Sequence, residues 1–269
     1  MAAQNNKEVD ALVEKITGLH AAIAKLPSLS PSPAVDLLFT ELINLSKLEY
    51  ELLARYVPGG IAPARVAFIG SGPLPFSSFV LAARHLPDTM FDNYDLCGAA
   101  NDRASKLFRA DKDMGARMSF HTADVADLAG ELAKYDVVFL AALVGMAAED
   151  KAKVIAHLGT HMADGAALVV RSAHRARGFL YPIVDPQDIT LGGFKVLAVC
   201  HPDDDVVNSV IIAQKSKDVH VSGLRSGPAV GGQSARSTVP VVSPPCRFGE
   251  MVADMTQKRE EFANAEVAF

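Results

Sequence analysis

The sequence predicts an α/β protein whose mostly parallel sheet is covered by helices on both faces. From residue 65 onward, short apolar runs typical of buried strands alternate with stretches of helical periodicity, which is the pattern of strand–helix–strand units. Seven runs are predicted as strands: 65–69, 90–96, 118–122, 136–140, 166–171, 194–200 and 209–214. Four stretches between them are predicted as helices: 76–84, 99–110, 127–134 and 148–161. Only a short acidic stretch separates the last two strands, so we expect them to close the sheet as an antiparallel hairpin.

Residues 1–57 are predicted to form a helical domain that precedes the sheet. Apolar residues recur every three or four positions over 7–26, which predicts a first amphipathic helix. A second helix is expected to have Ser32 as its N-cap and Pro33 as its first residue. It should end near Val57, because a Pro-Gly-Gly run follows.

Residues 58–217 are predicted to hold the α/β domain, and residues 218–269 a flexible C-terminal tail. The stretch 221–238 is rich in Gly, Ser and Ala and shows no apolar periodicity, which is typical of a linker. Residues 249–265 predict one helix within the tail.

Composition restricts the class of protein. The chain has 269 residues, of which 49% are hydrophobic, and its 26 basic and 31 acidic residues give a net charge of −5. A mildly acidic chain without a basic cluster is not expected to bind nucleic acid or an anionic membrane. The three cysteines predict a reducing compartment rather than a disulfide framework. We expect no signal peptide and no membrane span, and therefore a cytoplasmic protein that acts on a small molecule.

A glycine-rich turn follows the first predicted strand. Gly70, Ser71 and Gly72 stand between this strand and the next helix, where glycine lets the backbone approach a ligand and a helix N-terminus offers free N–H groups. Pro75 occupies the position of the third glycine of the dinucleotide pattern, which disfavours NAD. The alternative is a tight turn that binds nothing.

Two aspartates follow the next strands. Asp95 ends the second predicted strand, where a carboxylate can accept both hydroxyls of a ribose. Asp124 follows the third strand, where it can meet an adenine amino group. The alternatives are a solvated loop residue for Asp95 and a helix N-cap for Asp124. Because ligands of open α/β sheets bind outside the carboxyl ends of the strands, the glycine turn and both aspartates predict a nucleoside site. We therefore predict a Rossmann-type, seven-stranded fold like that of the S-adenosylmethionine-dependent methyltransferases.

Other candidates carry weaker signals. Arg171, His174 and Tyr181 follow the fifth strand and either face the cleft or make local hydrogen bonds. Glu49 and Glu51 lie on the second helix, where we expect them on the surface.

Histidine and cysteine do not form a metal-binding pattern. His157 and His161 have the spacing of a helical metal pair, but no third ligand or adjacent glutamate completes it. Cys200 and His201 precede an acidic hairpin tip. The sequence predicts no metal site.

Five runs of the sequence carry a further signal: FIGSGPLP (68–75), FDNYD (91–95), NLSKLE (44–49), RSAH (171–174) and GFLYP (178–182). Together they resemble the nicotianamine synthases of grasses, and the resemblance covers nearly the whole chain. GSGPLP (70–75) and FDNYD are not general features of methyltransferases.

The resemblance implies an enzyme that condenses three molecules of S-adenosylmethionine into nicotianamine, a metal chelator of plant iron homeostasis, and releases methylthioadenosine. In such a transferase an amine attacks the aminocarboxypropyl carbon of the sulfonium rather than its methyl group. The orientation in which the enzyme holds the two reactants decides which carbon is attacked. S-adenosylmethionine is the substrate, and the resemblance implies that it is bound by Gly70, Ser71, Gly72, Asp95 and Asp124.

The chain also departs from this family. Grass sequences have a longer helical domain before NLSKLE, which contains a catalytic glutamate and a Pro-Tyr-Tyr run with a catalytic tyrosine. Here only Ile43 stands between Leu42 and Asn44, and the sequence contains no two adjacent tyrosines. The catalytic residues are therefore unknown, and we expect little or no nicotianamine from this chain alone. The alternatives are a non-catalytic paralogue that binds S-adenosylmethionine, forms homo-oligomers or associates with full-length subunits, and an ordinary methyltransferase, which the resemblance disfavours. Arg175 stands where grass sequences tend to have glycine, beside the cleft loop.

Overall fold

The computed structural model describes residues 33–109, 111–179, 181–202, 206, 208–216 and 241–242. The predicted helix over 7–26, the N-cap Ser32, the linker 221–238 and the predicted helix over 249–265 lie outside these residues.

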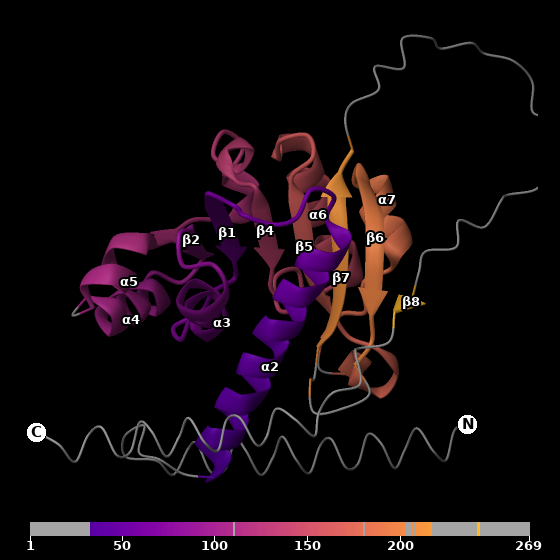
Figure 1. Ribbon diagram of the computed structural model, residues 1–269. Helices are drawn as coiled ribbons and strands as arrows, with labels where there is room; N and C mark the ends of the chain where they lie inside the picture. The colour runs from indigo at the N-terminus through magenta and orange to yellow at the C-terminus, as the bar shows by residue number, and fades with distance from the viewer. Residues whose placement is uncertain are drawn as a thin grey trace, which may run out of the picture.

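The first described element is the long helix α2 (Pro33–Tyr56). It begins at proline and ends before the Pro-Gly-Gly run, as predicted. Its apolar stripe is buried through Leu45, Leu48, Leu52 and Leu53. Figure 1 shows its amino-terminal part extending beyond the edge of the sheet at which the parallel strands end.

One sheet organises the rest of the structure, with the strand order β3-β2-β1-β4-β5-β7-β6-β8. The predicted strands all form: β1 (Arg65–Ile69), β2 (Met90–Asp95), β3 (Met118–Thr122), β4 (Val137–Leu140), β5 (Ala167–Ser172), β6 (Phe194–Cys200) and β7 (Ser209–Lys215). The pairs from β3 to β5 are parallel, whereas β7 is antiparallel to both β5 and β6. The predicted hairpin at the end of the sheet is therefore confirmed.

An eighth strand was not predicted. The two-residue strand β8 (Val241–Val242) pairs in parallel with β6. It is the only described part of the stretch 218–269, which the sequence predicts to be a flexible tail.

Helices and single turns connect the strands. They are α3 (Phe76–Val80), the π-helical turn η1 (Leu81–His85), α4 (Gly98–Phe108), α5 (Lys112–Arg117), η2 (Val125–Asp127), η3 (Leu132–Lys134), α6 (Ala148–His161), η4 (Arg175–Phe179) and α7 (Pro186–Leu191). The helix predicted over 127–134 is wrong, since two 3₁₀ turns stand there. Gly130 lies between them, and so short a segment with a central glycine does not sustain an α-helix. The short helices α5 and α7 were not predicted.

The core forms two layers, one on each face of the sheet. On one face the strands pack against α2, η1 and α5 in a cluster that includes Leu48, Leu53, Leu81, Met114, Phe68 and Phe139. On the other face they pack against α6, α7 and the two 3₁₀ turns in a cluster that includes Ile155, Leu158, Ile189, Leu132, Leu140 and Val170. Both faces of the central strands are therefore buried, as expected for a parallel sheet.

Candidate functional site

The glycine turn is tied to the strand beside it. The Gly70 and Ser71 N–H groups both donate to the Tyr94 carbonyl, at 2.8 and 3.1 Å. Gly70 has a φ of +83°, and a Cβ at this position would overlap Val144 Cγ2. Only glycine fits this conformation and this close approach, so the turn at the end of β1 is fixed against both β2 and the loop that follows β4.

Asp95 joins the glycine turn to the start of α4. Its Oδ2 accepts a hydrogen bond from Gly72 N and its Oδ1 accepts one from Cys97 N, each at 2.9 Å. The residue is partly exposed, so lone pairs of both oxygens remain open to a ligand hydroxyl. The structure thus brings together the glycine turn and the first predicted aspartate.

Asp124 lies at the same edge, on the neighbouring strand. β3 pairs with β2 in the register Asp95↔Thr122, and Ala123 N donates to the Asp95 carbonyl at 3.2 Å. The exposed carboxylate of Asp124 caps the turn η2, because its Oδ1 accepts a hydrogen bond from Ala126 N at 2.9 Å. Asp124 is therefore an N-cap, but of the turn η2 rather than of the predicted helix over 127–134.

Two buried oxygen atoms at this edge have no hydrogen-bond partner among the described residues. They are Ser71 Oγ and Asn101 Oδ1, in side chains that are 9% and 5% exposed. The amide of Asn101 donates to Thr122 Oγ1 at 2.9 Å and to the Asp95 carbonyl at 3.3 Å. Buried polar atoms are nearly always paired, so both oxygens fit a site that a polar ligand completes. Asn101 was not among the residues predicted from the sequence. The signal for it is its position four residues beyond Cys97, on the face of α4 that returns to Asp95.

On the other side of the glycine turn, a buried lysine holds the loop after β4. Lys151 is 2% exposed, and its Nζ donates to the carbonyls of Ala141 and Ala142 at 2.8 and 3.0 Å. Burial lowers the pKa of Lys151 from 10.5 to about 8. Lys151 was not among the residues predicted from the sequence, although its place one turn before the buried Ile155 marks it as inward-facing.

The expectation for Glu49 is wrong. Glu49 is fully buried, and Arg171 Nε and Nη2 donate to its two carboxylate oxygens at 2.7 and 2.9 Å. Arg171 also lies 5.2 Å from the centre of the Phe68 ring. The signal in the sequence is the position of Glu49 four residues after the buried Leu45, on the apolar stripe itself. Glu51 is partly exposed, as expected.

The three residues predicted after the fifth strand have separate surroundings. Arg171 belongs to the pair just described, so it binds α2. The ring of His174 stacks on that of His201 at 3.8 Å between centroids. Tyr181 is half-buried, and burial raises the pKa of its hydroxyl.

Arg175 has a left-handed backbone conformation, with a φ of +53°, and is the one non-glycine residue with positive φ in the described part of the chain. A side chain in this region is disfavoured by contacts of its Cβ. The structure thus gives a physical reason for the glycine that the resemblance implies at this position.

Much of the FDNYD run has a structural role. The Asp92 carboxylate accepts hydrogen bonds from Arg65 at 2.6 Å and Tyr135 at 3.1 Å and lies 2.9 Å from His121 Nε2. Burial raises the pKa of Asp92, but these hydrogen bonds outweigh it and lower the pKa below its usual range. The Tyr94 hydroxyl lies 2.6 Å from that of Tyr135. This network fixes β2, whose Tyr94 carbonyl holds the glycine turn.

The described residues contain no group of three or more His, Cys, Asp or Glu side chains arranged to hold a metal ion. His157 and His161 lie with ring centroids 4.5 Å apart on α6. Over the same part of the chain, no helix has both the length and the apolar character needed to cross a bilayer.

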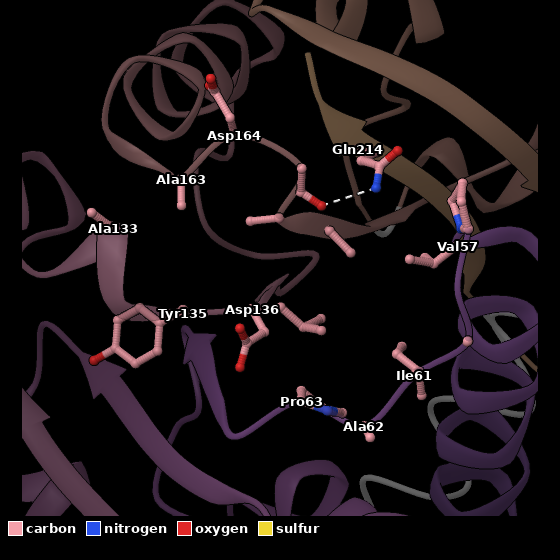
Figure 2. A pocket seen from close by; sticks show the side chains of 16 residues that line it. Val57, Ile61, Ala62, Pro63, Ala133, Tyr135, Asp136, Ala163, Asp164 and Gln214 are labelled. Atoms are coloured by element: carbon pink, nitrogen blue, oxygen red, sulfur yellow. Dashed lines mark hydrogen bonds between the residues drawn. The ribbon is translucent and has the colours of Figure 1, made fainter. Parts of the chain in front are cut away.

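A surface cavity of about 350 Å³ lies at the opposite edge of the sheet. Figure 2 shows its walls, where Pro63 and Asp136 precede β1 and β4 and Gln214 donates to the Gly165 carbonyl at 2.9 Å. These walls stand at the amino ends of the parallel strands. Since ligands of such sheets bind at the carboxyl ends, the geometry favours the edge with the glycine turn.

The chain is similar in sequence and in fold to known proteins. The chain is 74% identical to a probable nicotianamine synthase 2 of Hordeum vulgare over 335 positions, and 58% identical to nicotianamine synthase 2 of Oryza sativa subsp. japonica over 330. These comparisons cover 100% of both chains for the barley protein and 98% of both for the rice protein. Among solved structures, MtNAS in complex with MTA and tNA is 26% identical with a TM-score of 0.52, and covers 66% of this chain and 61% of its own. A mutant of MtNAS in complex with S-adenosylmethionine has a TM-score of 0.53 and 23% identity, over 79% of this chain and 74% of its own.

The comparisons also locate an internal gap. A comparison over 335 positions with a chain of 269 residues leaves 66 positions that this chain does not fill. The family model described as nicotianamine synthase protein matches in two stretches, 3–44 and 42–220, which meet where the sequence analysis places the missing segment. Helix α2 runs through this junction without a break. The match of both stretches and the identity to the barley and rice proteins show that this chain belongs to the nicotianamine synthase family.

Proposed function

We propose that this chain binds S-adenosylmethionine at the carboxyl edge of its sheet, through Gly70, Ser71, Gly72, Asp95 and Asp124. The observation that carries the proposal is the Asp95 carboxylate, which joins the glycine turn to the start of α4 and keeps lone pairs for a ribose. The turn lies between β1 and β4, where the order of the strands reverses and open sheets bind ligands. The MTA complex of the related MtNAS supports a nucleoside ligand.

Each residue has a proposed role in this complex. Gly70 lets the turn pack against the loop after β4, and Gly72 leaves open space through which the ligand can approach the backbone. Asp95 accepts hydrogen bonds from the ribose hydroxyls. The buried Ser71 Oγ and the Asn101 amide oxygen offer acceptors to the ligand. Asp124 Oδ2 accepts a hydrogen bond from the adenine amino group, while Asp124 Oδ1 continues to accept the hydrogen bond from Ala126 N at the start of η2.

We further propose that the chain by itself forms little or no nicotianamine. The family's reaction joins an amine nitrogen to the aminocarboxypropyl carbon and breaks its bond to sulfur, which leaves as methylthioadenosine. The amine must pass its proton to a base. Glu49 is a carboxylate of α2 close to the junction with the missing segment, but Arg171 holds it in a buried pair with both oxygens engaged, so it is not free to act as this base. Losing a positioned base costs about 10²–10⁴ in rate.

Binding is tested by titration calorimetry of the full chain with S-adenosylmethionine and methylthioadenosine. Asp95→Ala removes hydrogen bonds to a charged group and should raise the Kd about tenfold or more. The control is Asp113→Ala, an exposed aspartate on α5 that pairs with Arg117 at 2.6 Å. A folded wild-type chain that binds neither ligand contradicts the proposed function.

Catalysis is tested by chromatography of the products after incubation with S-adenosylmethionine, beside a full-length family member. We expect methylthioadenosine and nicotianamine at a rate at least a hundredfold lower than the full-length enzyme. Nicotianamine formed at a comparable rate would show that another residue of this chain serves as the base.

A second candidate function is a non-catalytic subunit that associates with full-length family members. It is favoured by large apolar side chains that are exposed in the loops after the parallel strands: Leu74, Leu96, Leu143, Met146 and Ile183. Co-purification of a tagged full-length member with the chain, lost on Leu96→Ser and Leu143→Ser, would support it, and separate elution in size-exclusion chromatography would refute it.

The sparse cysteines support a reducing compartment, and we propose the cytoplasm.

A further inference from the structure

We propose that Lys151 is a positioning residue, which holds the loop after β4 as one wall of the ligand crevice. The inference rests on the proposed function, because it assigns the lysine a role in nucleoside binding. Lys151 lies in the first turns of α6 and is 2% exposed. On the same helix, the side chain of Lys153 is 75% exposed and pairs only locally with Asp150. The burial of Lys151 is therefore specific to its position.

The ammonium of Lys151 binds the backbone where β4 ends. It donates to the carbonyls of Ala141 and Ala142, at 2.8 and 3.0 Å. Val144 N donates to the same Ala141 carbonyl at 3.3 Å, so the loop folds back on itself beneath the lysine. Since a buried ammonium without acceptors is strongly disfavoured, these two carbonyls and Lys151 hold one another in place.

The loop also packs directly on the backbone of α6. Gly145 has a φ of +69°, and a Cβ at this position would lie 2.7 Å from Lys151 N and 2.8 Å from Lys151 Cα. Glycine is therefore required for the loop to lie this close to the helix. The lysine side chain and Gly145 fix the loop from two directions.

The far side of the loop meets the glycine turn. Val144 Cγ2 occupies the space that a Cβ on Gly70 would need, and Ala141 Cβ would lie 3.2 Å from it. β1 and β4 are neighbours in the sheet, so the turn and the loop stand side by side at the edge where we propose that the ligand binds. A shift of the loop therefore changes the space that a nucleoside beside Gly70 can occupy.

The test measures the Kd of methylthioadenosine for the full chain and four variants by calorimetry, with urea denaturation of each. Lys151→Met keeps the apolar stem and removes the donors, and should raise the Kd about tenfold. Gly145→Ala displaces the same loop through backbone contact and should also raise it, which keeps the inference testable if Lys151→Met does not fold. Lys153→Met is the charge-matched control and should leave the Kd within about twofold.

Leu158→Ala separates positioning from general destabilisation. Leu158 is fully buried on the same helix, so its truncation should lower stability by about as much or more while the Kd stays within about twofold. A folded Lys151→Met variant with wild-type Kd overturns the inference, as does an equal rise of the Kd in Leu158→Ala. If the wild-type chain binds no methylthioadenosine, the proposed function is wrong and the inference falls with it.

Discussion

Removing the carboxylate of Glu49 while Arg171 stays in place should destabilise the chain by about 3–5 kcal/mol. Glu49 is fully buried and Arg171 is 9% exposed, and two hydrogen bonds of 2.7 and 2.9 Å join them. Glu49→Gln leaves the guanidinium in a medium of low polarity with a neutral partner. The pair joins α2 to β5, so the loss should appear as detachment of the helix from the sheet as well as lower global stability.

The size of the effect follows from what remains after each substitution. A single change leaves an uncompensated buried charge, whereas replacing both residues removes the charge and its partner together. The double variant Glu49→Leu with Arg171→Met should therefore recover most of the loss, because buried pairs and apolar residues of similar volume are often equal in stability. A loss of about 3–5 kcal/mol is a large part of the free energy of unfolding of a typical domain, which is roughly 5–15 kcal/mol.

The assay is urea denaturation at pH 7, followed by circular dichroism. Glu51→Gln is the matched control, since Glu51 lies two residues further on the same helix, 3.7 Å from Lys47, with both side chains partly exposed. Its cost should stay below about 1 kcal/mol. The reasoning is refuted if Glu49→Gln costs less than about 1 kcal/mol. It is also refuted if the losses of Glu49→Leu and Arg171→Met, each measured alone, simply add in the double variant.

Three further predictions concern single residues. Arg175→Gly should stabilise the chain by about 0.5–1 kcal/mol, because it relieves the φ of +53° at some cost in unfolded-chain entropy; an unchanged or lower melting temperature would contradict this. The pKa of Lys151 is lowered to about 8 in the folded chain, so the unfolded chain keeps its proton to higher pH. The free energy of unfolding of the wild-type chain, relative to that of Lys151→Met, should then be lowest below pH 8 and rise by up to about 3 kcal/mol toward pH 10.5. A difference in urea midpoints that does not change with pH would refute the lowered pKa of Lys151. Tyr135→Phe removes hydrogen bonds to Asp92 and Tyr94 and should cost about 1–3 kcal/mol in urea denaturation, whereas a neutral effect would show that the network adds nothing.

The sequence predicts the sheet because each strand is marked by residues close together in the chain. The strands at 65–69, 118–122 and 194–200 begin and end as predicted, since an apolar run with polar or glycine neighbours defines them locally. The hairpin at the end of the sheet follows from the short connection between its strands. The same local signals predict the glycine turn and Asp95, which the structure brings into contact.

Local signals fail where a segment is short or where two effects compete. The stretch 127–134 has leucines at helical spacing, but it is too short to form a helix around Gly130 without support from its neighbours. Conversely, α7 forms over only six residues, because Asp185 caps it and Ile189 is buried against the sheet. Packing, rather than propensity, decides such elements.

What the tertiary structure alone decided is which distant groups compensate the charges that lie inside. Glu49 and Lys151 stand in helices whose composition is ordinary, and their charges predict exposure. The partner of Glu49 is Arg171, 122 residues further along the chain, and the acceptors of Lys151 belong to a loop outside its helix. The sequence by itself determined the strands, the turn and the family, because these depend on residues near one another. A buried charge depends on a distant partner, and only the folded chain brings the two together.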